Sequence, residues 1–435
     1  MRRRDLIKAL SAAAFAASPA VAQVPKLNGV RMKITDVKIQ RLKVIKNLGF
    51  IDGWAGPWDK NPVLVGGGSF IEVHTDQGLV GIGPAIDPVQ LPRAKHDLIG
   101  RDPFDLQTIQ GDMSDVNGMG SERRLASVAP ADSKSSDGVM MSLREAAGRS
   151  DGTTADRRTA AVEIALWDII GKACNQPLYK IWGPVSDTVR AYASQSRLST
   201  PDKRAEFALQ LKESGWTAIK FRAHFASMKD DIALVEKTRK LVGDDWNIMV
   251  DANQATNWFL SPDVRWDFTR AARTAKAYND MNVYWLEEPL PRYDFDGLAE
   301  LNKLVEMPIA GGEGNTGLHE FRELLERGCF DIVQPEVNLV GPLLVRKVAA
   351  LAESMNKRIA PHLADGRFGT ICNMHLIASL PNGDYLEADQ DLPLHDYQNG
   401  FSIFEEPIVL QKGGVFNVPQ GPGLGVTVKK DWIQT

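Results

Sequence analysis

The chain has 435 residues, a length that favours two domains or one large α/β barrel with additions. Hydrophobic residues make up 43% and charged residues 24% of it, which is ordinary globular usage and excludes a mostly disordered protein. The formal net charge of −4, with no basic stripe and no recognition motif, excludes a typical nucleic-acid-binding protein.

The first 22 residues predict an export signal. Three consecutive arginines at positions 2–4 precede a short apolar run over 9–17, and Ala20-Val21-Ala22 supplies a small-residue cleavage pattern. The run is too short to span a bilayer, and the arginines resemble the twin-arginine signal of bacteria. We therefore expect residues 1–22 to be removed and the mature protein to be periplasmic, without a membrane span. The alternative is a basic amphipathic helix that stays in the mature protein.

Residues 32–155 predict a separate α+β domain. Three strand candidates form a meander around a turn at Gln77-Gly78, and helical segments follow. The strand candidates are 33–43, 70–76 and 79–83. Residues 111–155 are rich in Ser, Asp, Gly and Met and predict a mobile insertion. Between the first two strands, Trp54 and Trp58 stand beside glycines in a segment from Asn47 to Asn61, which indicates either a mobile lid or part of this domain's core.

Residues 156–390 predict a barrel. Short apolar runs alternate there with helix-period stretches, which is typical of βα units on a parallel sheet, and eight strands is the number that closes a barrel. The strand candidates are 188–194, 218–222, 248–252, 283–287, 308–312, 331–335, 358–362 and 384–387. Thr200 and Pro201 supply the N-cap and the first residue of one of the helices between them.

Ionisable residues end every predicted strand from the second to the eighth. The active site of such barrels lies at the carboxyl ends of the strands. A single residue of this kind would be ordinary surface charge, whereas a series at equivalent positions indicates a site. The residues are Lys220, Arg222, Asp251, Glu287, Glu288, Glu313, Glu336, His362 and Glu387.

Asp251, Glu287 and Glu313 predict a metal site. They come from adjacent strands, so their carboxylates can converge, and a hard divalent cation would offset their repulsion. Ligation by oxygen alone favours Mg²⁺ over zinc, which usually recruits His or Cys. We therefore predict Mg²⁺ as the cofactor, with open positions for substrate oxygens.

His362 is the candidate general base. Glu336 precedes it by one βα unit and can fix its tautomer and raise its basicity. Lys220 and Arg222, two residues apart on one strand, point to the same face and would add positive charge where an enediolate forms. Glu387, across the pocket, would donate a hydrogen bond to that charge if it is protonated. The alternative for His362 is a packing role in the core.

A set of motifs resembles the mandelate racemase/muconate lactonizing enzyme-like family of the enolase superfamily, from about Met32 to the end. The motifs are 161–168 with Gly171-Lys172, 220–222, 250–253, 285–289, 312–313, 361–363 and 422–426. The resemblance implies a (β/α)7β modified TIM barrel with an N-terminal α+β capping domain, which the segment 391–435 completes. It also implies Asp251, Glu287 and Glu313 as Mg²⁺ ligands, His362 as the dyad histidine and Glu387 as the acidic group opposite.

Two positions depart from the family pattern. Arg222 stands where a second lysine is usual, and Glu336 where the dyad has an aspartate. Arginine holds its proton too firmly for a routine base. This weakens the interpretation as a racemase, because a racemase needs a base on each face of the substrate carbon. Glu336 is one methylene longer than aspartate and can still reach the imidazole.

The favoured hypothesis is a dehydratase of an acid sugar or a related hydroxy acid, giving a 2-keto acid and acting on a small-molecule carboxylate. We expect Trp54, Asn253 and His224 to contact this substrate, and the protein to be a homo-oligomer. One alternative is a racemase or epimerase in which Lys220 serves the second face. The other is a non-catalytic periplasmic binding protein on the same barrel.

Overall fold

The computed structural model describes residues 31–53, 56–113, 157–197, 199–223, 225–363 and 366–435. The chain divides into two units, Met1–Met32 and Lys33–Thr435, and the second unit carries every element discussed below. The expected signal segment and most of the expected insertion lie outside the described residues. No helix within the described ranges is both long enough and apolar enough to cross a membrane.

The predicted meander is confirmed. Three antiparallel strands lie in the order β1-β4-β5. Their bounds are β1 Ile34–Arg41, β4 Ser69–Thr75 and β5 Val80–Gly83, and the helices α2 (Leu91–Leu98) and α3 (Leu106–Met113) follow. Helix α6 (Arg157–Ala173) crosses β5 so closely that a Cβ on Gly81 would lie 2.0 Å from the carbonyl oxygen of Ala165. Position 81 therefore requires glycine.

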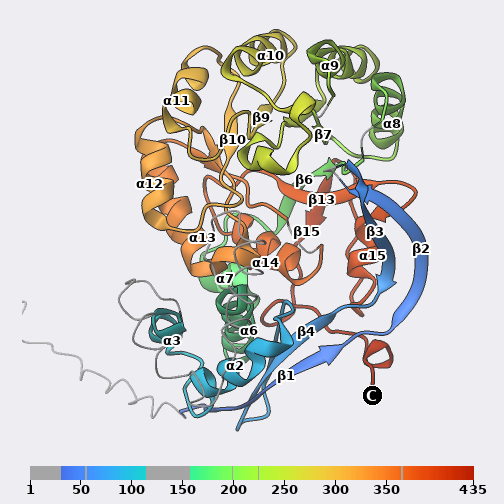
Figure 1. Ribbon diagram of the computed structural model, residues 1–435. Helices are drawn as coiled ribbons and strands as arrows, with labels where there is room; N and C mark the ends of the chain where they lie inside the picture. The colour runs from blue at the N-terminus through green and yellow to red at the C-terminus, as the bar shows by residue number, and fades with distance from the viewer. Residues whose placement is uncertain (1–30, 54–55, 114–156, 198, 224, 364–365) are drawn as a thin grey trace, which may run out of the picture. The chain divides into compact units, whose positions relative to one another are not determined.

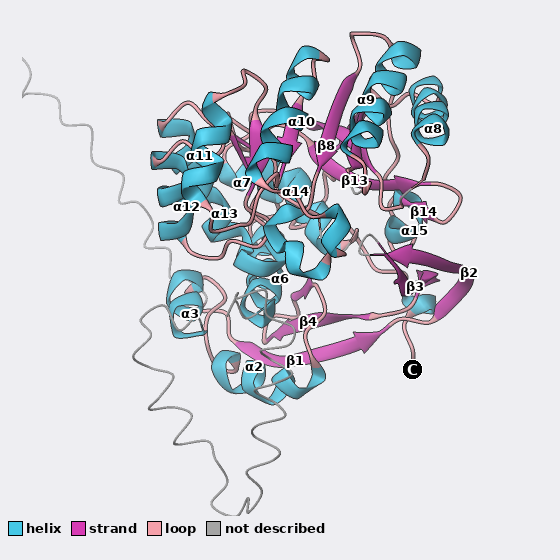
Figure 2. Cartoon of the chain, turned by 45° about the horizontal axis from the view of Figure 1, so that its top comes forward, coloured by secondary structure: helices cyan, strands magenta, loops and turns pink. Residues whose placement is uncertain are grey.

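A long hairpin joins β1 to β4, where the sequence left a lid or a core segment open. Its strands, β2 (Val44–Gly53) and β3 (Gly56–Gly66), pair antiparallel with several irregularities in register. Figures 1 and 2 show the hairpin curving away from β1 and β4 toward α15 (Tyr397–Phe401). Trp54 and the side chain of Trp58 lie outside the described residues.

All eight predicted barrel strands are present and parallel. They follow one another in the order β12-β11-β10-β9-β8-β7-β6-β13. Their bounds are β6 Thr188–Ser194, β7 Ala218–Arg222, β8 Asn247–Asp251, β9 Trp285–Glu287, β10 Ile309–Gly311, β11 Ile332–Val333, β12 Arg358–Ile359 and β13 Leu386–Asp391. The amide of Asp384, just before β13, donates to the carbonyl of Ile359 at 2.8 Å, so hydrogen bonds also join the two ends of the row.

Helices follow the strands in alternation, as the sequence predicted, and Figure 1 shows them around the outside of the strands. Their bounds are α8 Pro201–Glu213, α9 Met228–Val242, α10 Phe268–Asp280, α11 Phe295–Lys303, α12 Leu318–Glu326, α13 Val337–Ser354 and α14 Phe368–Ile377. The predicted cap of α8 is confirmed, because the Thr200 side chain accepts from the amide of Lys203 and Pro201 is the first helical residue.

The C-terminal segment contacts both the parallel strands and the N-terminal meander. Strand β15 (Val415–Asn417) pairs antiparallel with β6, and the amide of Gln434 donates to the carbonyl of Arg41 at the end of β1. Asp168 of α6, fully buried, accepts from the amide of Leu424 at 2.9 Å and from that of Ile82 at 3.0 Å. One carboxylate thus joins α6, β5 and the 422–426 motif, which gives these family motifs a structural role.

Glu163, on the buried face of α6, predicts an unusual dependence of stability on pH. Its side chain accepts from the amide of Leu343 at 2.5 Å and from Gln110 at 2.9 Å, and burial raises its pKa from 4.5 to about 8. The folded state then binds the proton more tightly than the unfolded state. The contribution of Glu163 to the free energy of unfolding is full below pH 4.5 and is lost as the pH rises through about 8.

We therefore expect Glu163→Gln to stabilise the protein relative to wild type as the pH rises from 5 to 9. The gain should be roughly 1 kcal/mol per pH unit between pH 5 and 8 and should level off above the folded-state pKa of about 8, since one pKa unit corresponds to about 1.4 kcal/mol. Denaturant unfolding at pH 5, 7 and 9 measures it, with the exposed Glu236→Gln on α9 as the matched control. Equal pH slopes for Glu163→Gln and wild type would overturn the assignment.

Candidate active site

The predicted ionisable residues gather at the carboxyl ends of the strands, as expected. Arg222 ends β7, Asp251 ends β8 and Glu287 ends β9, and the three are neighbours in register across the sheet. Glu313, Glu336 and His362 follow β10, β11 and β12, and Glu387 lies within β13. The alternation of strand and helix therefore places all of them at one end of the sheet.

Lys220 is completely buried among carboxylates. Its Nζ lies 2.9 Å from Oε1 of Glu287, 3.1 Å from Oε1 of Glu387 and 3.9 Å from Oδ2 of Asp251. Burial alone would lower the pKa of the ammonium, but the charges of Glu287 and Glu387 raise it well above its ordinary value. Lys220 is therefore held as a cation.

Arg222 pairs with Asp251. One guanidinium nitrogen donates to Oδ2 of Asp251 and also to Oδ1 of Asn253 at 3.0 Å. Asn253, predicted to contact substrate, donates to Asp251 from its main-chain amide at 2.8 Å and from its side chain at 3.0 Å. Asn253 thus positions the Asp251 carboxylate in this structure, and its contact with substrate stays a prediction.

The dyad of Glu336 and His362 forms as predicted. Oε2 of Glu336 lies 2.7 Å from Nδ1 of His362, while Oε1 accepts from the amide of Asn338 at 2.7 Å and caps α13. The extra methylene of glutamate is therefore compatible with the dyad. Nε2 of His362 lies 3.0 Å from Oε2 of Glu313, on the side of the carboxylate cluster. Burial lowers the pKa of the imidazole, but Glu313, Glu387 and Glu336 raise it well above the usual value.

Glu387 corrects one expectation. Oε1 accepts from the Ser194 hydroxyl at 2.7 Å and pairs with Lys220, while Oε2 accepts from the amide of Leu363 at 3.2 Å and lies 3.9 Å from Nε2 of His362. Burial would raise the pKa of this carboxyl, but Lys220, His362 and Arg222 lower it far below its ordinary value. The expected protonated donor is wrong for this arrangement, because Glu387 is an acceptor surrounded by donors.

The three predicted metal ligands are each paired with a cationic side chain. Asp251 contacts Arg222, Glu287 contacts Lys220, and Glu313 contacts His362. As the side chains stand, no three His, Cys, Asp or Glu groups of the described residues close on a common metal position. A bound cation would therefore have to compete with these partners for the carboxylate oxygens.

A fourth carboxylate, Glu288, bears on whether the residues fit a metal ion. It is 2% exposed, and neither of its oxygens has a hydrogen-bond partner within the described chain. Burial and the charges of Glu313 and Asp251 raise its pKa well above the ordinary value. An unpartnered buried carboxylate beside three others is a donor set that suits a hard divalent cation, so the residues fit Mg²⁺ chemically.

Glu288 is among the ionisable residues predicted at the strand ends, but the sequence pattern assigned it no role. Strict strand alternation would turn it away from the face that Glu287 occupies. The structure shows a left-handed backbone at Glu288, with φ of 45°, which breaks that alternation. Ser194 and Gln334 were also missed. Gln334 donates to Oε2 of Glu287 at 2.8 Å, and neither residue carries a charge that would mark it in the sequence. Trp54 and His224, predicted to contact substrate, lie outside the described residues.

Comparisons with known proteins show which proteins this chain is similar to. The family model described as "Enolase C-terminal domain-like" matches residues 203–432. The chain is 31% identical to L-talarate/galactarate dehydratase of Salmonella typhimurium over 66% of this chain and 68% of that protein. It is 28% identical to D-xylonate dehydratase of Haloferax volcanii over 84% of each chain, and 32% identical to arabinonate dehydratase of Saccharolobus solfataricus over 62% and 69%.

Solved structures share the fold. An enolase superfamily member from Salmonella typhimurium superimposes with a TM-score of 0.70 at 21% identity, covering 92% of this chain and 97% of that one. A racemase from Streptomyces coelicolor with bound magnesium gives a TM-score of 0.68 at 24% identity, covering 92% and 100%. The chain therefore belongs to the enolase superfamily, where its relatives are acid-sugar dehydratases and mandelate racemase/muconate lactonizing enzyme-like proteins.

Proposed function

We propose that this protein is a Mg²⁺-dependent dehydratase of acid sugars. The observation that carries the proposal is the geometry of the Glu336–His362 dyad. Nδ1 of His362 pairs with Glu336, and Nε2 faces Glu313 of the carboxylate cluster, whereas Lys220 makes ion pairs with Glu287 and Glu387. His362 is therefore positioned to take a proton from the substrate, whereas Lys220 is held as a cation by its ion pairs and is not. Three similar proteins named as acid-sugar dehydratases support the same reaction class.

The reaction we propose is an elimination of water. In its neutral form, His362 removes through Nε2 the proton from the carbon next to the substrate carboxylate. The electron pair of the broken C–H bond forms a carbon–carbon double bond as the C–O bond on the neighbouring carbon breaks. The hydroxyl leaves as water with the proton that His362 returns. The resulting enol takes a proton from solvent at the third carbon, releases its hydroxyl proton to solvent and becomes a 2-keto acid. Glu336 keeps the imidazole in one tautomer throughout.

Positive charge has to balance the second negative charge that develops on the substrate carboxylate. Arg222 and Lys220 supply part of it from β7. Asp251, Glu287 and Glu313 would hold Mg²⁺, with Glu288 adjacent, and the ion when bound supplies Lewis-acid stabilisation at the substrate carboxylate. Glu387 accepts from Ser194 and Leu363, so in this scheme it orients the charged groups around it.

An assay for 2-keto acids over a panel of acid sugars with Mg²⁺ tests the function. The proposal requires at least one substrate that yields one keto acid per molecule consumed. A racemase or epimerase is the second candidate, favoured by the similar fold of a racemase from Streptomyces coelicolor. It would convert the substrate to its epimer and form no keto acid. Binding of carboxylates without either reaction would support the binding-protein alternative.

The finer architecture belongs to the same proposal. We infer a (β/α)7β barrel over 156–390, a capping domain over 32–155 and a segment over 391–435 that completes the cap. The alternation of strands and helices and the contact of Gln434 with Arg41 support it. Homo-oligomerisation stays a prediction.

We also propose export of the folded enzyme by the twin-arginine route. Replacing Arg3 and Arg4 together with lysine should keep the protein in the cytoplasm, because that signal is read through its paired arginines. Fractionation of cells that express the wild type and the Arg3→Lys/Arg4→Lys variant measures this, with Arg2→Lys as the matched control. Unchanged periplasmic recovery of the double variant would contradict the route.

A further inference from the structure

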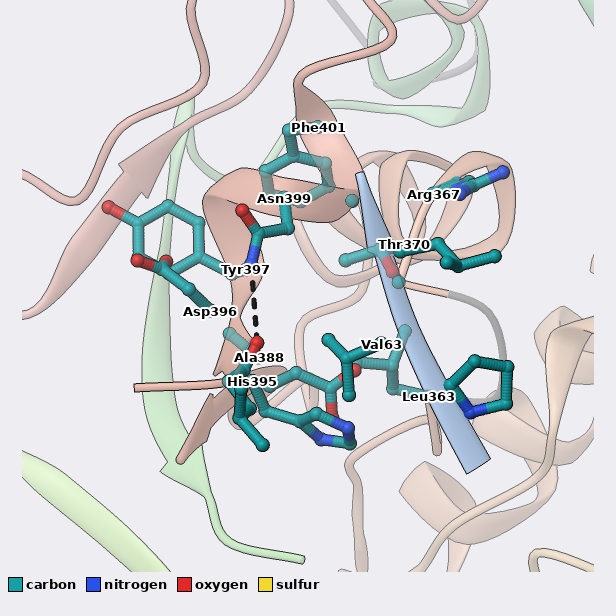
Figure 3. Close-up of a pocket in the computed structure, with 16 residues that line it drawn as sticks. Val63, Leu363, Arg367, Thr370, Ala388, His395, Asp396, Tyr397, Asn399 and Phe401 are labelled. Carbon is teal, nitrogen blue, oxygen red and sulfur yellow. Dashed lines mark hydrogen bonds between the residues drawn. The ribbon is translucent and has the colours of Figure 1, made fainter. Parts of the chain in front are cut away.

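A cavity of about 200 Å³ lies beside the dyad and has no part in the scheme above. Figure 3 shows its walls, which come from β3, the segment after β12, the first turn of α14, and the stretch from β13 to α15. Val63, Leu363 and Phe401 give it apolar surface, and Asp389, His395 and Thr370 give it polar surface. The cavity thus has a mixed lining, typical of small-molecule sites.

Two residues of the lining adjoin catalytic residues along the chain, and a third contacts the segment after β6. Leu363 follows His362 directly, and Asp389 lies two residues after Glu387 on β13, so the two acids share a face of that strand. His395 reaches back to the end of β6, where its Nδ1 lies 3.2 Å from the Ser196 hydroxyl. A role for this cavity in the reaction requires that a substrate with its reacting carbon at His362 extend its far end into it.

Two polar groups of the lining lack partners within the described chain. Thr370 is 1% exposed, and its hydroxyl has no hydrogen-bond partner there. No described residue donates a hydrogen bond to the carboxylate of Asp389, which is half-buried, and burial raises the pKa of this carboxyl. Buried polar groups normally have partners, so this lining calls for a ligand that carries hydroxyl groups.

The charges of the lining argue against a second carboxylate on that ligand. Two carboxylates, Asp389 and Asp396, border the cavity. The guanidinium of Arg367, which also borders it, donates to the main-chain carbonyls of Gly66 and Gly67 at 2.8 Å each and so holds the end of β3. An anionic substrate terminus would meet Asp389 at close range, where like charges repel. Hydroxyl groups would instead donate to Asp389.

We propose that this cavity selects acid sugars with one carboxylate and a hydroxylated tail, and rejects those with a carboxylate at both ends. Asp389 accepts hydrogen bonds from the tail hydroxyls, with Thr370 and His395 beside it. The inference rests on the proposed dehydratase function and narrows its substrate class. It separates two kinds of substrate named for similar proteins, galactarate with two carboxylates and arabinonate or xylonate with one.

The test compares kcat/KM on matched pairs of five- and six-carbon acid sugars, each with a carboxylate at one end or at both. Wild type should prefer the monocarboxylates by at least roughly tenfold. Asp389→Asn should lower kcat/KM on them roughly 10- to 100-fold, mostly through KM, because it removes a charged acceptor far from the reacting carbon. The same variant should lower the ratio of kcat/KM on monocarboxylates to kcat/KM on dicarboxylates. Glu236→Gln, exposed on α9, is the control for loss of one negative charge.

The outcomes separate this inference from the function beneath it. Dehydration of dicarboxylates in preference to monocarboxylates by wild type would overturn the selection and leave the dehydratase standing. An unchanged preference in a folded Asp389→Asn variant would do the same. If wild type dehydrates no acid sugar at all, the proposed function fails and this inference fails with it. The wild-type preference needs no variant, so misfolding of Asp389→Asn does not remove the test.

Discussion

Replacing His362 with alanine is expected to lower kcat for dehydration by roughly 10³-fold, because the imidazole paired with the Glu336 carboxylate would be gone. Proton exchange at the carbon next to the carboxylate should disappear to the same extent, since the same base starts both processes. Keto-acid formation and hydrogen–deuterium exchange of the substrate measure the two effects. Circular dichroism shows whether the variant is folded.

Two further variants sharpen this result. His319→Ala removes an exposed histidine from α12 and should leave turnover within about twofold of wild type. Glu336→Asp restores the usual family residue and should keep most of the activity. Glu336→Gln should lower kcat more than Glu336→Asp does and less than His362→Ala does. Full turnover by a folded His362→Ala variant would show that another group removes the proton and would overturn the assigned base.

Replacing Glu313 with glutamine is expected to abolish most Mg²⁺-dependent activity, with a loss of roughly 10²- to 10³-fold in kcat/KM and weaker Mg²⁺ binding. An amide oxygen is a poorer ligand for a hard cation than a carboxylate. Glu313 is the informative choice among the predicted ligands. Its side chain is 24% exposed, whereas changing Glu287 would leave the buried Lys220 without its nearest counter-charge.

Metal dependence and ligand identity need separate readouts. Removing divalent ions with EDTA should abolish wild-type activity, and Mg²⁺ should restore it. Calorimetric titration with Mg²⁺ alone then reports the affinity of Glu313→Gln without reference to turnover. Glu326→Gln, an exposed acid on α12, is the control and should bind Mg²⁺ as wild type does. Equal affinity of Glu313→Gln and wild type would remove Glu313 from the ligand set.

The sequence predicted the barrel strands well because short, mostly apolar and β-branched or aromatic runs alternate there with helix-period stretches. The runs at 188–194 and 218–222 match β6 and β7 residue for residue. The hairpin β2–β3 was not predicted. Its residues 47–61 mix glycines, one proline and charged residues with aromatics, a composition that does not separate a strand from a loop.

The candidate site was predicted at the level of which residues meet, but not of how they pair. Strand-end positions are set by the barrel, so Asp251, Glu287 and His362 could be placed from spacing alone. Which cation faces which carboxylate depends on side-chain geometry, and the charged state of Glu387 follows from three neighbouring cations that spacing does not reveal. Asp389 lies past the strand-end residue that we singled out on β13.

The central claim is that one imidazole at the barrel end starts an elimination. The measurement that tests it most directly is turnover of an active acid sugar in D₂O with Mg²⁺, followed by NMR and mass spectrometry of product and recovered substrate. The account predicts a 2-keto acid that carries solvent deuterium at the third carbon, with no inverted substrate. Recovered substrate with deuterium at an inverted second carbon, and no keto acid, would contradict it.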